Sequence, residues 1–323
     1  MAVKTLTYAQ AAALALSDGM QRDERVVALG EDIGRGGIFG QYAGLQATWG
    51  PERVIDTPIS EATIVGAGVG MALLGLRPVV EMRVIDFALC AMDEIVNQAA
   101  KNRYMFGGQG RVPIVMRMPI GMWVNSAAQH SQSLEAWFAH LPGVVVLCPA
   151  TAQDNYELLT WALQAEDPVV YLENKELWAH AGAVDTQACL PPDRARVMRR
   201  GEHLTLVAWS AAVHTIEQAA DRLQAQGISA SVIDLRALWP WDRATVLQDC
   251  ARTGRLLVVQ DAVQVAGFGA EVAATAAQET GCHVARLGAP RIPVGYAACL
   301  ENLARISVDE VVATAQHLVS STP

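Results

Sequence analysis

Short apolar runs alternate with helical patterns along most of the chain, and this alternation limits the fold more than any other feature. The predicted strands are Val26–Leu29, Pro78–Met82, Pro113–Met116, Val144–Leu147, Val169–Leu172, Leu204–Trp209, Ala230–Asp234, Leu256–Val259 and His283–Arg286. The predicted helices include Tyr8–Arg22, Ala62–Leu76, Ala88–Tyr104, Ala152–Gln164, Ala212–Gln226, Arg243–Thr253 and Ala270–Thr280. Strands that are apolar almost throughout are buried on both faces, so we expect an α/β fold with parallel sheets between helices.

A lapse in this pattern divides the chain into two predicted domains. Between Trp178 and Arg200 the periodicity is lost, and Pro191, Pro192 and several arginines occur there. We therefore expect a larger domain over residues 1–190 and a smaller one over residues 191–323. Two domains are also the natural expectation for a chain of 323 residues.

The composition excludes some functions and suggests a location. A net charge of −9 without a basic tract argues against a nucleic-acid partner. The longest uncharged run, Ala62–Leu76, is too short to span a membrane, and the first residues show no signal peptide. The six cysteines are scattered singly, which predicts buried, reduced thiols and a cytoplasmic protein. The hydrophobic content of 52% indicates a large core or surfaces covered by other subunits.

The segment Asp56–Glu61 ends in a carboxylate just before the apolar, glycine-containing run Ala62–Leu76. A carboxylate that enters an apolar site there could donate or shuttle a proton. The alternative is structural: Ser60 caps the helix and Glu61 is an acid of its first turn.

Neither glycine-rich segment matches a nucleotide-binding motif. Gly34–Gly40 lacks the Lys-Ser/Thr of a phosphate loop, and Gly66–Gly70 lacks a third glycine because Met occupies position 71. We interpret Gly66 and Gly70 as a flat helix face against which another helix packs. His130, in the loop after a predicted strand, either acts as acid, base or anion donor or merely holds the loop.

Several motifs occur together in the order found in one family. They are Gly30-Glu31-Asp32, Asp56-Thr57-Pro58-Ile59-Ser60-Glu61, Gly75-Leu76-Arg77-Pro78, Ala99-Ala100-Lys101, Arg103-Tyr104, Gly107-Gly108, His130-Ser131-Gln132-Ser133, His140-Leu141-Pro142-Gly143 and Asp234-Leu235-Arg236. With them the chain resembles, over essentially its whole length, the β subunit of the thiamine-diphosphate-dependent decarboxylating component of 2-oxo acid dehydrogenase complexes. Pyruvate, branched-chain 2-oxo acid and acetoin dehydrogenases share this plan.

The resemblance implies a pyrimidine-binding transketolase-like domain followed by a transketolase C-terminal-like domain. It also implies an α2β2 heterotetramer whose α subunit holds the diphosphate of the cofactor and its Mg²⁺. The Gly-Asp-Gly signature for that diphosphate is not in this sequence. The implied reaction cleaves a 2-oxo acid or acetoin and passes the acyl fragment to a lipoyl-bearing acyltransferase.

Site residues are also implied by the resemblance. Glu61 matches the glutamate that hydrogen-bonds the aminopyrimidine ring of the cofactor, Phe87 the aromatic residue that stacks on this ring, and Ile59 a residue at its edge. His130 matches a histidine near the substrate or the lipoyl group. A monovalent cation, K⁺, is expected on the backbone carbonyls of Ile114, Ala162, Leu163, Ala165 and Asp167.

The chain departs from the family pattern at Gly121–Ser126, at Arg83, where a neutral residue is expected, and at Gln260-Asp261. Two other functions therefore stay open. One is half of a split transketolase that acts on sugar phosphates, for which the loop Pro119–Ser133 supplies few His and Arg residues. The other is a scaffold subunit without catalysis.

Overall fold

A computed structural model describes residues 3–321, and these form two compact units. The first unit comprises the chain up to Ile120 together with Trp137–Pro191, and the second comprises Gly121–Ala136 together with the chain from Pro192. The segment Gly121–Ala136, which contains His130, therefore belongs to the second unit although it lies far from Pro192 in the sequence.

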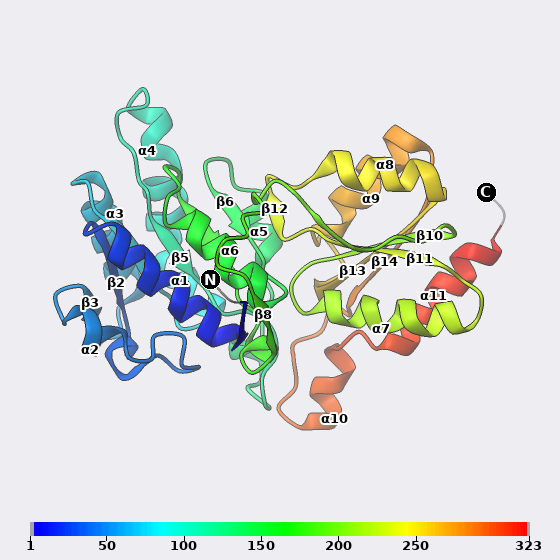
Figure 1. The fold of residues 1–323 in the computed structure, drawn as a ribbon, viewed down its shortest axis with the longest axis horizontal. Coiled ribbons are helices and arrows are strands. Elements are labelled where there is room, and N and C mark those ends of the chain that lie inside the picture. Colours follow the sequence, from blue (N-terminus) through cyan, green and yellow to red (C-terminus); the bar gives the residue numbers. More distant parts are fainter. Residues whose placement is uncertain (1–2, 322–323) are drawn as a thin grey trace. The chain divides into compact units, whose positions relative to one another are not determined.

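The first unit is built on parallel strands, as Figure 1 shows. Their order is β6 (Val145–Leu147), β7 (Val169–Tyr171), β5 (Val115–Arg117), β4 (Arg77–Glu81), β2 (Val26–Gly30) and β3 (Val54–Asp56). Every neighbouring pair in this order is parallel. A small antiparallel pair joins β1 (Lys4–Thr7) to β8 (Ala181–Val184). The buried parallel sheet expected from the apolar runs is confirmed.

The helices of the first unit are α1 (Tyr8–Arg22), α2 (Leu45–Trp49), α3 (Glu61–Leu73), α4 (Ala100–Met105) and α6 (Ala152–Ala162). A further helix, α5 (Glu135–Ala139), runs across the change of unit. Helix α1 begins with a capping box between Thr7 and Gln10 and packs along α6.

The helix predicted over Ala88–Tyr104 is present, but its type changes along its length. It consists of a 3₁₀ segment (Ile85–Ala91), a π-helical segment (Glu94–Ala99) and then α4. The Asp93 carboxylate accepts a hydrogen bond from the side-chain amide of Asn97 at 2.6 Å. A π-helical turn shifts the backbone hydrogen bonds by one residue, which an apolar period cannot reveal.

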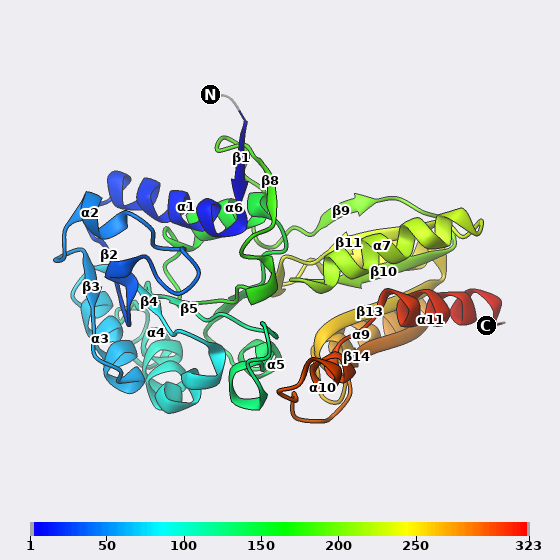
Figure 2. The same cartoon turned by 90° about the horizontal axis from the view of Figure 1, so that it is seen from below.

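The second unit has a five-stranded sheet in the order β14 (His283–Ala289), β13 (Arg255–Val263), β10 (Leu204–Ala208), β11 (Ala230–Asp234) and β9 (Arg196–Arg199). The pairs are parallel except that β9 runs antiparallel to β11. Figures 1 and 2 show α7 (Ala212–Ala225) and α11 (Val308–Ser320) on one face, and α8 (Arg243–Thr253) and α9 (Gly269–Thr280) on the other. The remaining elements are β12 (Ala237–Trp239) and α10 (Ala298–Glu301).

The prediction of buried cysteines needs correction. All six cysteines are free, but Cys90, Cys189 and Cys299 are exposed, so the expectation of buried thiols was wrong for these three. They lie in a 3₁₀ segment, a loop and the short α10, none of which contributes to a sheet core. Within residues 3–321, no helix combines the length and the apolar character that crossing a membrane requires.

Candidate active site

The carboxyl ends of β2, β3 and β4 lie side by side at one edge of the first sheet, because these strands are parallel and paired. Open parallel sheets bind ligands at this edge. Glu31 follows β2, Glu61 begins α3 five residues after the last residue of β3, and Phe87 follows β4. The fold therefore gathers the segments that carry Glu61, Ile59 and Phe87 at one edge.

Glu61 occupies the first turn of α3, and its carboxylate has no hydrogen bond or ion pair with any described residue. Ser60 stands at the N-cap position, yet its hydroxyl makes no capping bond and instead donates to Oγ1 of Thr63 at 2.8 Å. The helix N-terminus favours a negative charge at Glu61. The side-chain cap on which the structural alternative depended is therefore not formed.

The surroundings of Glu61 are more open than expected. Glu61 and Phe87 are half-buried, and Ile59 is 71% exposed. Only Val65, one turn into α3, is fully buried. The first turn of α3 lies at the surface of its unit, so the apolar enclosure of the Glu61 carboxylate stays a prediction for the assembled enzyme.

Arg83 introduces a positive charge at the same edge. Its guanidinium contacts Glu31 at 2.8 Å and Asp32 at 3.4 Å. Both Arg83 and Asp32 have positive φ values, 37° and 61°, which non-glycine residues rarely adopt. Strained backbone of this kind concentrates at functional sites. Arg83, the residue that departs from the family pattern, is thus held in a strained backbone conformation.

His130 ends a short 3₁₀ segment of the second unit and is half-buried. The loop before it has positive φ values at Val124, Asn125 and Ala127. The backbone N–H of Asn125 anchors this loop by donating a hydrogen bond to Oε2 of Glu301 at 2.9 Å. His130 thus sits on a strained loop with a defined anchor.

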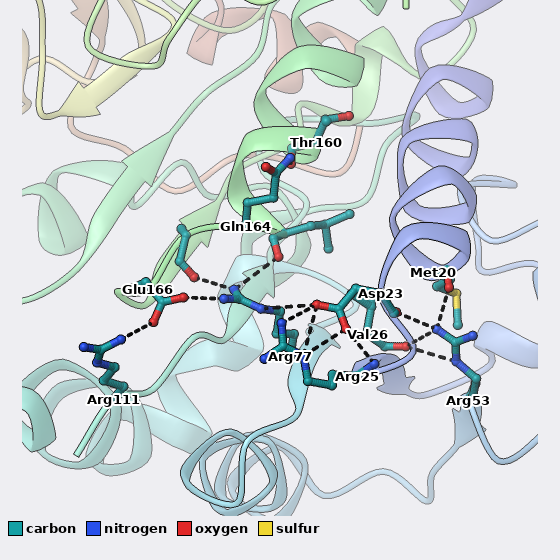
Figure 3. Close-up of polar contacts among 12 residues, drawn as sticks. Met20, Asp23, Arg25, Val26, Arg53, Arg77, Arg111, Thr160, Gln164 and Glu166 are labelled. Atoms are coloured by element: carbon teal, nitrogen blue, oxygen red, sulfur yellow. Dashed lines mark hydrogen bonds and ion pairs between the residues drawn. The ribbon is translucent and has the colours of Figure 1, made fainter. Parts of the chain in front are cut away.

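Arg77 reaches the carbonyl cluster that we assigned to a monovalent cation, as Figure 3 shows. Its Nη1 donates to the carbonyl oxygens of Leu163 at 3.3 Å and Ala165 at 2.9 Å, and its Nη2 donates to Glu166. The carbonyls of Ile114 and Ala162 accept backbone N–H groups.

A carbonyl oxygen has two lone pairs and could still ligate a cation. A potassium ion on all five carbonyls would, however, share two of them with the Arg77 guanidinium, whose positive charge repels it. Sequence reasoning missed this contact, which spans more than 80 residues. In residues 3–321, no group of three or more His, Cys, Asp and Glu side chains is arranged to hold a metal.

A buried charge cluster was also missed. Arg117 and Glu173 form two hydrogen bonds of 2.8 Å while both side chains are fully buried, and Glu81 lies 4.0 Å from Arg117. Burial raises the pKa of Glu81 to about 7. The available signal was a charged residue at the end of two apolar strands, Glu81 in β4 and Arg117 in β5, and Glu173 two residues after β7.

Comparisons with known proteins cover nearly the whole chain. Residues 4–179 match the family model described as "Transketolase, pyrimidine binding domain", and residues 193–311 match "Transketolase, C-terminal domain". A pyruvate dehydrogenase E1 component subunit beta-2 of Oryza sativa is 41% identical, with 98% of this chain and 87% of the relative covered. A 2-oxoisovalerate dehydrogenase subunit beta of Bacillus subtilis is 38% identical, with 98% and 99% covered.

Two further similarities bear on the substrate and the fold. The subunit beta of an acetoin:2,6-dichlorophenolindophenol oxidoreductase of Cupriavidus necator is 38% identical, with 94% of each chain covered. A solved structure titled "Split gene transketolase, inactive beta4 tetramer" has a TM-score of 0.84, covers 98% of this chain and 99% of its own, and is 22% identical. At that identity the likeness concerns the fold alone.

Proposed function

The chain belongs to the family of β subunits of thiamine-diphosphate-dependent 2-oxo acid and acetoin dehydrogenases, and from this premise we propose how it takes part in the reaction. The chain is a subunit of an oxidoreductase, and the names of its relatives imply an α partner. We propose an α2β2 heterotetramer that cleaves a 2-oxo acid or acetoin next to its carbonyl group. The acyl fragment then passes to a lipoyl group of an acyltransferase.

The observation that carries this proposal is the carboxylate of Glu61, which is half-buried, has no partner among residues 3–321 and lies at the binding edge of the sheet. Such a carboxylate fits the ring nitrogen of an aminopyrimidine, because it can accept or share one proton there. Phe87 and Ile59 come from the same edge and supply an aromatic and an aliphatic surface. These residues would hold the pyrimidine end of the cofactor.

When bound, thiamine diphosphate supplies a nucleophilic carbon that permits cleavage next to a carbonyl group. Glu61 would orient the cofactor and hold a proton at its carboxylate. His130, on its strained loop, would donate a proton or a hydrogen bond to the substrate or the lipoyl group. The α subunit would hold Mg²⁺ and the diphosphate.

The carbonyl cluster around Leu163 and Ala165 fits a monovalent cation in the type of its ligands. We propose potassium binding there in competition with Arg77, since two positive charges within one cluster repel each other. The cytoplasm remains our proposal for the location, supported by six cysteines that are all free.

The test is co-expression with a candidate α subunit, followed by thiamine-diphosphate-dependent reduction of an artificial electron acceptor. Pyruvate, branched-chain 2-oxo acids and acetoin are compared as substrates. Activity with one class supports the proposal and names the substrate. Ketol transfer from a sugar phosphate would favour the split-transketolase alternative, and no turnover from a well-formed heterotetramer that binds the cofactor would favour the scaffold alternative.

A further inference from the structure

A cavity of about 500 Å³ lies entirely within the second unit. One wall comes from the segment that carries His130 and includes Ser131 and Leu134. The opposite wall comes from the ends of β13 and β14 and the chain after them, and includes Ala262, Val263 and Arg291. Its size falls within the range of about 300–1,000 Å³ that is usual for ligand sites.

Most of the residues that line the cavity are apolar, and Arg291 is the positively charged residue among them. Arg291 is exposed and makes no hydrogen bond or ion pair with any described residue. An arginine that is free on the wall of a mostly apolar cavity can bind a carboxylate through two parallel hydrogen bonds.

Ser131 provides a second polar group in the same lining. The residue is only 4% exposed, and its buried hydroxyl has no hydrogen-bond partner among the described residues. A buried polar group without a partner is costly, and native structures usually satisfy it. A rotation of the Ser131 side chain toward the cavity would bring this hydroxyl within reach of a ligand oxygen, which would then provide that partner.

Asp261 limits the charge of the ligand. Its half-buried carboxylate lies on the same lining as Arg291. A second negative charge on the ligand would therefore meet repulsion, whereas a single carboxylate can be placed against Arg291. We propose that this cavity binds an organic monocarboxylate with an apolar body, its carboxylate on Arg291 and Ser131 and its body on Leu134, Ala262 and Val263.

Isothermal titration calorimetry of the full-length chain with isovalerate tests the proposal. The neutral isovaleramide has nearly the same shape, and inorganic phosphate supplies an anion without an apolar body. We expect isovalerate to bind more tightly than either compound. Equal binding of the amide would overturn the role of the charge, and equal binding of phosphate would overturn the role of the apolar wall. No heat from isovalerate at millimolar concentration would overturn the proposal as a whole.

Single substitutions test which residues bind isovalerate. Arg291→Met should weaken isovalerate binding roughly tenfold or more, because a charge-assisted hydrogen bond is lost. Ser131→Ala should weaken it less, and Arg291→Lys should restore part of the affinity. Arg243→Met is the matched control, since Arg243 is exposed on α8 and pairs with Glu279 outside this lining. Unchanged affinity in Arg291→Met, with the fold confirmed by circular dichroism, would contradict the assignment.

The proposal is independent of the thiamine site. Glu61→Gln should lower the turnover of the assembled enzyme by about 10²–10⁴ and leave isovalerate binding intact. Failure of that variant to lose turnover would sink the proposed function only, whereas failure of Arg291→Met to lose binding would sink this inference only.

Discussion

The guanidinium of Arg117 and the carboxylate of Glu173 form a doubly hydrogen-bonded ion pair in the interior of the first unit, with both side chains at 0% exposure. Asn155 also donates to Glu173, at 3.0 Å, and the Tyr42 ring lies 4.9 Å from the guanidinium carbon. Removal of one partner leaves the other charge buried and unpaired.

We expect Glu173→Ala to lower the free energy of unfolding by about 3–5 kcal/mol, measured by urea denaturation. Replacing the pair by apolar residues, Arg117→Met with Glu173→Leu, should recover much of that loss because the main unpaired charge is gone. A double variant as unstable as Glu173→Ala would show that the lost packing, and not the unpaired charge, sets the cost.

Glu81 should make the stability depend on pH. Burial raises its pKa in the folded chain to about 7, above the unfolded value of 4.5. The folded state therefore binds more protons between these values, so this contribution is fully present below pH 4.5 and is lost as pH rises through about 7. We expect the melting temperature of the parent chain to fall relative to Glu81→Gln between pH 5 and pH 8. Parallel pH profiles for the two proteins would contradict the assignment.

Helix α3 allows a test of its glycine face. A Cβ at Gly68 would lie 2.7 Å from Val80 and 2.8 Å from Ile114, whereas a Cβ at Gly70 would meet nothing within 4 Å. At Gly66 a Cβ would lie 3.6 Å from Glu94 of the π-helical segment, so the predicted helix packing is present there and absent at Gly70 inside this chain, while Gly68 makes the closest approach.

We expect Gly68→Ala to destabilise the chain by about 1–3 kcal/mol. Gly70→Ala should stabilise the isolated chain by up to about 1 kcal/mol, since alanine is the better helix former. Thermal melts of the two variants measure the difference, and equal melting temperatures would refute the packing argument.

Potassium should reveal the role of Arg77. Because its guanidinium takes the Leu163 and Ala165 carbonyls, we expect potassium to raise the melting temperature of the parent chain no more than sodium does. In Arg77→Met these oxygens are released, and potassium should then stabilise more than sodium. Arg111→Met is the control, because Arg111 pairs with Glu166 at 3.1 Å without contacting either carbonyl. Equal potassium effects in all three proteins would refute the competition.

The sequence could predict what depends on local pattern. Apolar runs and helical periods predicted the two α/β sheets, whereas the pairing of Glu61 with Phe87 came from the resemblance to the family. Contacts between residues far apart in the sequence could not be predicted. One of them is the hydrogen bond from the Asn125 backbone N–H to the Glu301 carboxylate, which helps to place Gly121–Ala136 in the second unit. The free carboxylate of Glu61 could not be foreseen either, because Ser60 in that position usually caps a helix.

Glu61 carries the proposed function, so its substitution is the decisive test. Glu61→Gln keeps the shape of the side chain but cannot hold the same proton, and we expect kcat of the assembled enzyme to fall by about 10²–10⁴. Glu52→Gln is the matched control, because Glu52 is exposed just before β3 and should retain full activity. Size-exclusion chromatography must show the same heterotetramer for both variants, since a dissociated complex would lose activity for another reason. A Glu61→Gln enzyme that assembles and turns over at the parent rate would remove Glu61 from the reaction, and with it the observation on which the catalytic proposal depends.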